Sequence, residues 1–188
     1  MLLEALRDFE WLNEPENVIF HDKEMRIVAK KGTDFWQSKN HHLHRDNGHF
    51  FYAKKSDDFT FTVKWQFGKM YPFHQCGLMV RIDENNWIKA SILYDSPECP
   101  MIGSSVTQYG YSDWVAQDVP ATISEIWFRI KYLQGDCLLY YSLDGKTFRQ
   151  MRLAHLVNSL PEIKVGAYVC NPTQTEFEAV LSVLEFQN

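Results

Sequence analysis

The sequence predicts an all-β fold, a two-sheet antiparallel sandwich that runs from about residue 17 to the C-terminus. Apolar and polar residues alternate along most of this region, which is the period of half-buried strands. Turn signals separate these runs at intervals of roughly ten residues, a spacing typical of sandwiches. Aromatic residues make up 15% of the chain, which favours strands. Because the chain has 188 residues, we expect a single domain that covers 1–188.

The N-terminal segment has a different pattern. Residues 2–12 have the apolar spacing of one short amphipathic helix, which residues 13–15 would end. Acids at Glu4 and Asp8 interrupt the apolar core that a signal peptide requires. No apolar run approaches the ~18 residues of a membrane-spanning helix. We therefore expect a short N-terminal helix and no membrane association.

Alternation assigns the two faces of a central hairpin. The predicted core residues of its strands are Cys76, Leu78, Val80, Ile82, Ile88, Ala90 and Ile92. Residues opposite each other across a hairpin share a face, so Arg81, Trp87 and Lys89 must lie together on the other face. Two registers remain open. Arg81 lies opposite Lys89 in one, whereas in the other it lies opposite Trp87 and Met79 lies opposite Lys89.

Further strands complete the predicted sheets. Alternation or apolar runs place strands at 49–54, 59–66, 163–169 and 177–186. A second hairpin turns at Gly135 and Asp136. It is expected to match Phe128, Ile130 and Tyr132 with Leu139, Tyr141 and Leu143.

Charge and cysteine content exclude several classes of protein. The formal net charge is −5 and there is no run of lysines and arginines, which argues against a nucleic-acid partner and an anionic membrane surface. The four cysteines are far apart in the sequence, with no Cys-x-x-Cys pair. Without a secretory signal, free thiols in the reducing cytoplasm are the expected state.

The non-core face of the central strands is the best candidate for a binding site. Trp87, and Tyr168 on a later strand, could stack on a sugar ring. Arg81 and Lys89 could donate charge-assisted hydrogen bonds, and their like charges require a nearby acid or a ligand. The predicted ligand-binding residues are His44, Gln75, Arg81, Trp87, Lys89, Trp114 and Tyr168. A solvated sheet face of mixed polarity is the alternative.

Histidines are concentrated in one segment, at His41, His42, His44 and His49. His42 and His44 have the strand spacing of two, and Asp46 could be a third metal ligand. Because the segment contains no recognised metal motif, we interpret it as a polar loop near the ligand site. We expect no metal ion and no cofactor.

Catalytic constellations are incomplete in the sequence. Glycosidases need two carboxyl groups, and the strand-borne pair with a suitable spacing is Glu176 and Glu178. A pair formed by His44 and Asp46 is the other acid–base candidate. A solvated strand end is the simpler account of the two glutamates, so we assign no catalytic residue and favour a protein that is not an enzyme.

Seven stretches of the chain resemble a known family. They are Glu10–Pro15, Thr33–Trp36, Arg45–Tyr52, Gln75–Lys89, Gly110–Trp114, Ser142–Phe148 and Val165–Pro172. Together they are similar to an uncharacterised family of the concanavalin A-like superfamily, one fungal member of which is named for regulation of enolase. The resemblance implies a jelly-roll sandwich related to lectins and family 16 glucanases, which bind ligands on the concave sheet or its rim loops. The glucanase acid signature and the metal loop of legume lectins are absent here.

These observations lead to one functional hypothesis and two rivals. We expect a non-catalytic ligand-binding or regulatory protein of carbohydrate metabolism, located in the cytoplasm. It would hold a sugar or a sugar-derived metabolite on its concave sheet face. A carbohydrate-active enzyme is the first alternative. The second is a protein-interaction module, in which the aromatic face would be a surface for a partner or a homodimer.

Overall fold

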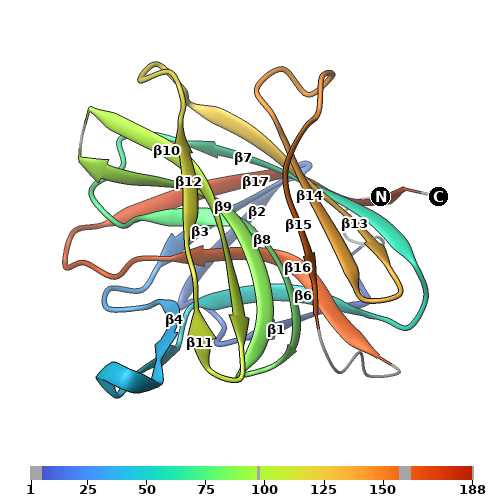
Figure 1. Cartoon of the computed structure of the whole chain (residues 1–188). Coiled ribbons are helices and arrows are strands. Elements are labelled where there is room, and N and C mark those ends of the chain that lie inside the picture. Colours follow the sequence, from blue (N-terminus) through green and yellow to red (C-terminus); the bar gives the residue numbers. More distant parts are fainter. Residues whose placement is uncertain (1–5, 97, 157–161, 188) are drawn as a thin grey trace.

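The computed structural model describes residues 6–96, 98–156 and 162–187, which form two antiparallel sheets packed face to face (Figure 1). The larger sheet has the spatial order β1 (Phe9–Leu12), β6 (His49–Lys55), β16 (Ile163–Cys170), β8 (Gln75–Asp83), β9 (Asn86–Ser96), β10 (Cys99–Gln108), β11 (Tyr111–Ser112), β4 (Phe35–Ser38) and β5 (Leu43–Asp46), and β12 (Val115–Asp118) also pairs with β10. The smaller sheet has the order β15 (Arg149–His155), β14 (Asp136–Ser142), β13 (Glu125–Leu133), β7 (Phe59–Phe67), β17 (Phe177–Gln187), β3 (Glu24–Ala29) and β2 (Asn17–His21). The predicted all-β sandwich is confirmed.

The predicted N-terminal helix is wrong over the part that the structure describes. Phe9–Leu12 form β1, which pairs with β6, and residues 1–5 lie outside the described residues. Phe9 and Trp11 alternate along the strand, and both rings pack on Phe51, with centroid distances of 5.1 and 4.7 Å. Burial of two aromatic rings outweighs the modest helical preference of so short a segment. In the described residues, no helix has the length and apolar character needed to cross a membrane.

The core between the sheets contains the residues that alternation assigned to it. The inward side chains of β8 and β9, from Cys76 to Ile92, belong to this core. The register places Arg81 opposite Trp87 and Met79 opposite Lys89, which settles the choice between the two registers. Trp65 of β7 crosses the core and donates a hydrogen bond from Nε1 to the carbonyl of Gly77, at 2.9 Å. This contact ties the smaller sheet to the middle of the larger one.

The second hairpin differs from its prediction at one end. Phe128 pairs with Tyr141 and Ile130 pairs with Leu139, as the alternation indicates. Tyr132 lies opposite Cys137, whereas Leu143 lies beyond the end of β14 and is 42% exposed. The predicted set of partners lies two residues too far along the chain, because the strand ends at Ser142, whose hydroxyl accepts a hydrogen bond from the Gly145 N–H in the following turn.

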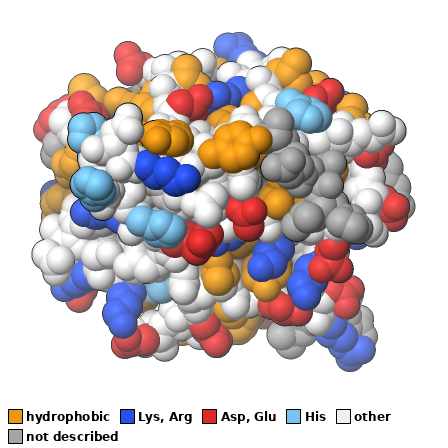
Figure 2. Space-filling model, turned by 60° about the horizontal axis from the view of Figure 1, so that its bottom comes forward, with side chains coloured by type: hydrophobic (Ala, Val, Ile, Leu, Met, Phe, Trp, Pro, Cys, Tyr) orange, Lys and Arg blue, Asp and Glu red, His pale blue; other side chains and the backbone are white. Residues whose placement is uncertain are grey.

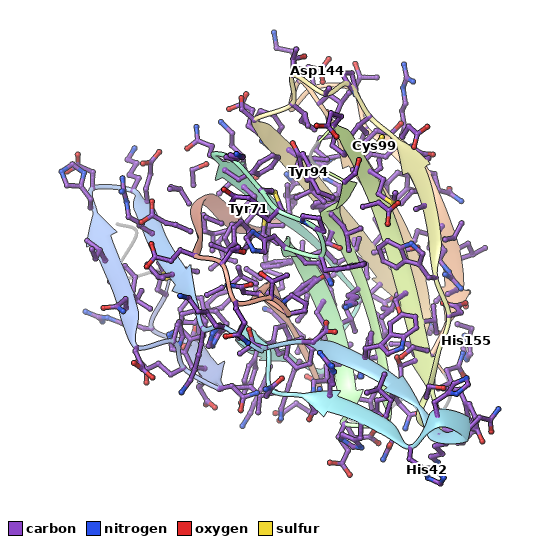
Figure 3. The ribbon with its side chains drawn as sticks, turned by 90° about the vertical axis from the view of Figure 1, so that its left-hand side faces the viewer. His42, Tyr71, Tyr94, Cys99, Asp144 and His155 are labelled. Carbon is purple, nitrogen blue, oxygen red and sulfur yellow. The ribbon has the colours of Figure 1, made fainter. Side chains whose placement is uncertain are left out.

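The larger sheet curls over its own non-core face. After β10, the sheet continues through β11 to the β4–β5 hairpin, which crosses in front of the central strands (Figure 3). We call residues 33–48 the cover and the side of the larger sheet beneath it the covered face. A second apolar cluster lies there and consists of Phe35, Phe50, Tyr52, Met79, Trp87, Tyr168 and Cys170. The fold therefore has a third layer over part of the sandwich.

A buried histidine makes this fold sensitive to acid. His74 is fully buried, its Nδ1 accepts the Tyr71 N–H at 3.2 Å, and its Nε2 lies 2.9 Å from Thr175 Oγ1. Burial lowers the pKa of His74 to about 4 from the ordinary value of 6.5. Between these two values the unfolded chain binds a proton that the folded chain does not, so stability falls as the pH falls.

We expect the free energy of unfolding to decrease from pH 6.5 to about 4. The His74→Asn variant should be less stable at neutral pH and should show a shallower dependence on pH. Urea titrations followed by tryptophan fluorescence measure both quantities. The exposed His21→Asn substitution is the control and should keep the wild-type slope. Equal slopes for wild type and His74→Asn would contradict the assignment.

Candidate functional site

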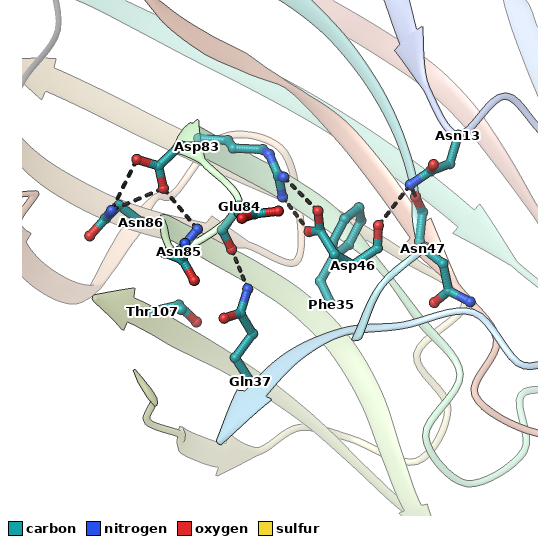
Figure 4. A network of polar contacts seen from close by, with 12 residues as sticks. Asn13, Phe35, Gln37, Asp46, Asn47, Asp83, Glu84, Asn85, Asn86 and Thr107 are labelled. Atoms are coloured by element: carbon teal, nitrogen blue, oxygen red, sulfur yellow. Dashed lines mark hydrogen bonds and ion pairs between the residues drawn. The ribbon is translucent and has the colours of Figure 1, made fainter. Parts of the chain in front are cut away.

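Two buried cations lie on the covered face, and the first is Arg81. Its guanidinium donates two parallel hydrogen bonds to Asp46, with NH1 and NH2 lying 2.6 and 2.7 Å from the two carboxylate oxygens. The Arg81 side chain is 6% exposed and that of Asp46 is 20% exposed. Asn13 donates from Nδ2 to the carbonyl oxygens of Asp46 and Gly48, at 3.0 and 2.9 Å (Figure 4). The end of the hairpin is thereby fixed to the covered face.

Lys89 is the second cation and is 1% exposed. Its ammonium donates to the backbone carbonyl of Phe35 at 2.7 Å and to Gln75 Oε1 at 3.0 Å. The ring centroids of Trp87 and Tyr168 lie 5.5 and 5.4 Å from Nζ, within the range of cation–π attraction. The cover therefore offsets the like charges of Arg81 and Lys89 without a ligand. Asp46 accepts hydrogen bonds from Arg81, and the Phe35 carbonyl accepts one from Lys89.

Two ionisable groups near Lys89, the Tyr168 phenol and the Cys170 thiol, are kept neutral by burial. The Tyr168 hydroxyl donates to Gln75 Oε1 at 3.3 Å, and complete burial raises the pKa of this tyrosine well above its ordinary value. Burial likewise raises the pKa of the Cys170 thiol, although the Lys89 charge acts in the opposite direction. A neutral phenol and a neutral thiol therefore lie close to the Lys89 side chain.

A cavity of about 640 Å³ opens above Lys89. Its lining residues are Asp34, Trp36, Arg45, Phe73, Gln75, Lys89, Leu93, Asp95, Met101, Trp114 and Pro172. The volume lies within the range of small-molecule sites, and the combination of apolar walls with a few converging polar groups is typical of them. Figure 2 shows acidic, basic and histidine side chains intermixed on one side of the molecule, without a dominant sign of charge.

The hairpin has two faces with different roles. Pairing places Phe35 opposite Asp46 and Trp36 opposite Arg45. Since successive residues of a strand point to opposite sides, the Phe35–Asp46 face packs on Arg81, whereas the Trp36–Arg45 face lines the cavity. The same short segment therefore neutralises one cation and forms a wall of the cavity.

Trp114 lines the cavity because β10 contains a glycine beneath it. A Cβ atom on Gly103 would lie 2.3 Å from Cζ2 of the indole, so the ring rests directly on the backbone of β10. The preceding residue, Asp113, accepts the Val106 N–H at 2.7 Å and forms an ion pair with Arg152 of β15 at 2.5 Å. The loop that carries Trp114 is thus attached to both sheets.

The structure separates the predicted site residues into three groups. Gln75, Lys89 and Trp114 line the cavity. Arg81, Trp87 and Tyr168 are buried beneath the cover, so the expectation of a solvent-facing surface fails for them. His44 is exposed and lies on the hairpin face that points away from the cavity. Trp87, which is 0% exposed, therefore cannot form the partner surface considered as an alternative.

Several cavity residues were missed by sequence reasoning. Asp34, Trp36 and Arg45 come from the cover, and Asp95 is the penultimate residue of β9. The signals in the sequence are the stretches 33–36 and 45–52, which enter only through the family resemblance. Because β4 and β5 have four residues each, alternation within them is too short to reveal a strand, and their position over the covered face depends on pairing with the distant β11.

The carboxylates considered for catalysis lie elsewhere. Glu178 is on β17 of the smaller sheet, 3.1 Å from Arg26, and its side chain is 46% exposed. Glu176 precedes that strand and is exposed. Neither lines the cavity, which agrees with the interpretation as a solvated strand end. Of the other acid–base candidates, Asp46 is held in the ion pair with Arg81.

The two-sheet architecture with a covered face defines a concanavalin A-like jelly-roll sandwich. The chain belongs to the family described as "Protein of unknown function (DUF1349)", whose model matches residues 11–188. It is 30% identical over 172 residues to "Regulation of enolase protein 1" of Saccharomyces cerevisiae, covering 92% of this chain and 85% of the yeast protein. The family predicted from the sequence is confirmed.

Solved structures support the same fold. A functionally unknown protein from Saccharomyces cerevisiae superposes with a TM-score of 0.88 at 29% identity, over 97% of both chains. A glycoside hydrolase of family 43 from Bacteroides ovatus gives a TM-score of 0.76 at 14% identity, over 96% of this chain and 36% of that chain. The carbohydrate-binding module CBM66 from Bacillus subtilis gives 0.61 at 12% identity, over 95% of both chains.

The buried ion pair leads to a prediction about stability. Removing the carboxylate with Asp46→Ala should destabilise the fold by about 3 kcal/mol, because it leaves the Arg81 guanidinium buried without its partner. The matched control is Glu178→Ala, which breaks an exposed ion pair and should cost less than about 1 kcal/mol. Guanidinium chloride unfolding measures both values. Similar losses in the two variants would show that the Arg81–Asp46 pair does not hold the cover.

Proposed function

We propose that this chain is a non-catalytic binding protein whose cavity holds a sugar or a sugar-derived metabolite. The observation that carries the proposal is the floor of the cavity, where a buried ammonium and a buried amide are fixed in place beside aromatic walls. Lys89 has three N–H donors, and in the described part of the chain Phe35 and Gln75 accept two of them. Asp34 Oδ1 lies 4.0 Å from the ammonium, beyond hydrogen-bond distance, so the third donor can still bind an oxygen of the ligand.

The rest of the lining suits a ligand with several hydroxyl groups. Trp36 and Trp114 offer flat apolar rings of the kind that pack on the faces of sugars. Asp34 and Asp95 can accept hydrogen bonds from hydroxyl groups, and Arg45 can donate to a hydroxyl or a carboxylate. Since two acids and two bases line the cavity, both neutral sugars and sugar acids are candidates.

The relatives support the proposal at a coarse level. One structural neighbour is a carbohydrate-binding module, and others are glycoside hydrolases of which this chain matches about a third. The name of the yeast relative suggests a regulatory role in carbohydrate metabolism, which we extend to this chain as part of the proposal. A cytoplasmic location is also proposed, because all four cysteines are free thiols.

A panel of D-xylose, D-glucose, D-fructose, D-gluconate, D-glucuronate and a hexose phosphate tests the proposal. At least one class should raise the melting temperature and give a saturable heat in calorimetry. Trp114→Ala should weaken that binding by roughly three- to tenfold, since a stacked aromatic contact is worth about 0.5–1.5 kcal/mol. Trp114 is 37% exposed, so the variant should remain folded.

The matched control is Tyr109→Ala, which removes an aromatic ring that is 56% exposed and does not line the cavity. Its affinity should equal that of the wild type. A panel without binding, or equal losses in the two variants, would refute the cavity as a carbohydrate site.

A further inference from the structure

A second cluster of polar groups lies on the Phe35–Asp46 face of the β4–β5 hairpin, opposite the face that lines the cavity. His44 and Asp46 occupy alternate positions of β5 and therefore share a face. Glu84 comes from the turn between β8 and β9 and lies beside Asp46 (Figure 4). One ligand atom of each residue lies within 4.8 Å of the others. None of the three lines the cavity, so this cluster is separate from the proposed ligand site.

Both elements that carry the cluster are anchored. Gln37 of the hairpin donates from Nε2 to the carbonyl oxygen of Glu84. Asp83 accepts hydrogen bonds from the Asn85 N–H at 2.8 Å and from Asn86 Nδ2 at 2.9 Å, which holds the turn. A fixed spacing between the turn and the hairpin means that few degrees of freedom would be lost when a ligand joins them.

The local charge favours a cation. The carboxylates of Asp46 and Glu84 lie close to each other, and Arg81 supplies one positive charge to Asp46. The guanidinium occupies one position on each oxygen of Asp46, but a carboxylate has about four lone-pair sites, so an oxygen can still bind an ion. Carboxylate ligands of metals are ordinarily hydrogen-bonded in this way.

The donor set selects the type of ion. One imidazole nitrogen with two carboxylate oxygens suits a borderline metal such as Zn²⁺, whereas Ca²⁺ and Mg²⁺ prefer oxygen ligands alone. We propose that His44, Asp46 and Glu84 bind a divalent transition-metal ion of the zinc type, with water at the remaining positions. The ion links the β8–β9 turn to the hairpin and so stabilises the cover over the covered face.

The sequence indicated only part of this site. His42 was paired with His44 as a ligand candidate, but it adopts a left-handed conformation with φ of 50° after the short 3-10 helix Lys39–His41. It lies at the tip of the hairpin, pointing away from the sheets (Figure 3). Glu84, which takes its place in the cluster, is distant in the sequence from the histidine-rich segment.

Calorimetry with zinc sulfate tests the proposal. The metal-free protein carries Cys99→Ser throughout, because that thiol is exposed and could bind zinc by itself. We expect one Zn²⁺ per chain, an increase in melting temperature on addition of zinc, and no saturable heat with calcium chloride. His44→Ala and Glu84→Gln should each weaken zinc binding by at least about tenfold. Both residues are exposed, so both variants should fold.

The matched control is His41→Ala, which removes an exposed histidine of the same segment that is not part of the cluster. It should bind zinc like the parent protein. The proposal is overturned if the parent protein does not bind zinc. It is also overturned if His44→Ala and Glu84→Gln bind zinc as tightly as His41→Ala. Neither result bears on the carbohydrate cavity, which is probed by its own ligands and by Trp114.

Discussion

Two buried cations on the covered face of the larger sheet impose the constraint on which this structure depends. Arg81 and Lys89 are placed there by the alternation of β8 and β9, and both are removed from water. An unpaired buried charge costs several kcal/mol, a large fraction of the stability of a domain. The chain meets this requirement with the cover, which supplies the Asp46 carboxylate to Arg81 and the Phe35 carbonyl to Lys89.

The cover in turn determines the shape of the cavity. Phe35 packs against the backbone of Gly48, where a Cβ atom would lie 2.5 Å from the phenyl ring. The close approach keeps the hairpin low over Arg81 and Tyr168, with which the ring makes a cation–π and an edge contact. The hairpin lies over only part of the covered face. The cavity opens over the rest, above Lys89, and the Trp36–Arg45 face of the same hairpin forms one of its walls.

Features that depend on residues close together in the sequence could be predicted, whereas features that depend on contacts between distant segments could not. The core residues of β8 and β9 depend on alternation and are predicted, whereas alternation and a short turn leave two registers for their pairing, of which the structure shows one. The common face of Arg81, Trp87 and Lys89 was also predicted, but its burial was not. Burial depends on residues 33–48, which reach that face through the sheet order β10-β11-β4-β5 rather than through a local pattern. The N-terminal segment failed similarly, because Phe9 and Trp11 form a strand only in contact with Phe51 of β6.

The positions of β16 and β17 have a consequence for the order of assembly. β16 lies between β6 and β8, and β17 lies between β7 and β3, so the last two strands are central in both sheets. During synthesis, the larger sheet cannot close before Cys170 has left the ribosome, and the smaller sheet cannot close before Gln187 has done so. Until then β6, β7 and β8 each have one edge whose backbone N–H and C=O groups lack their final partner, and pairings between such distant segments form slowly.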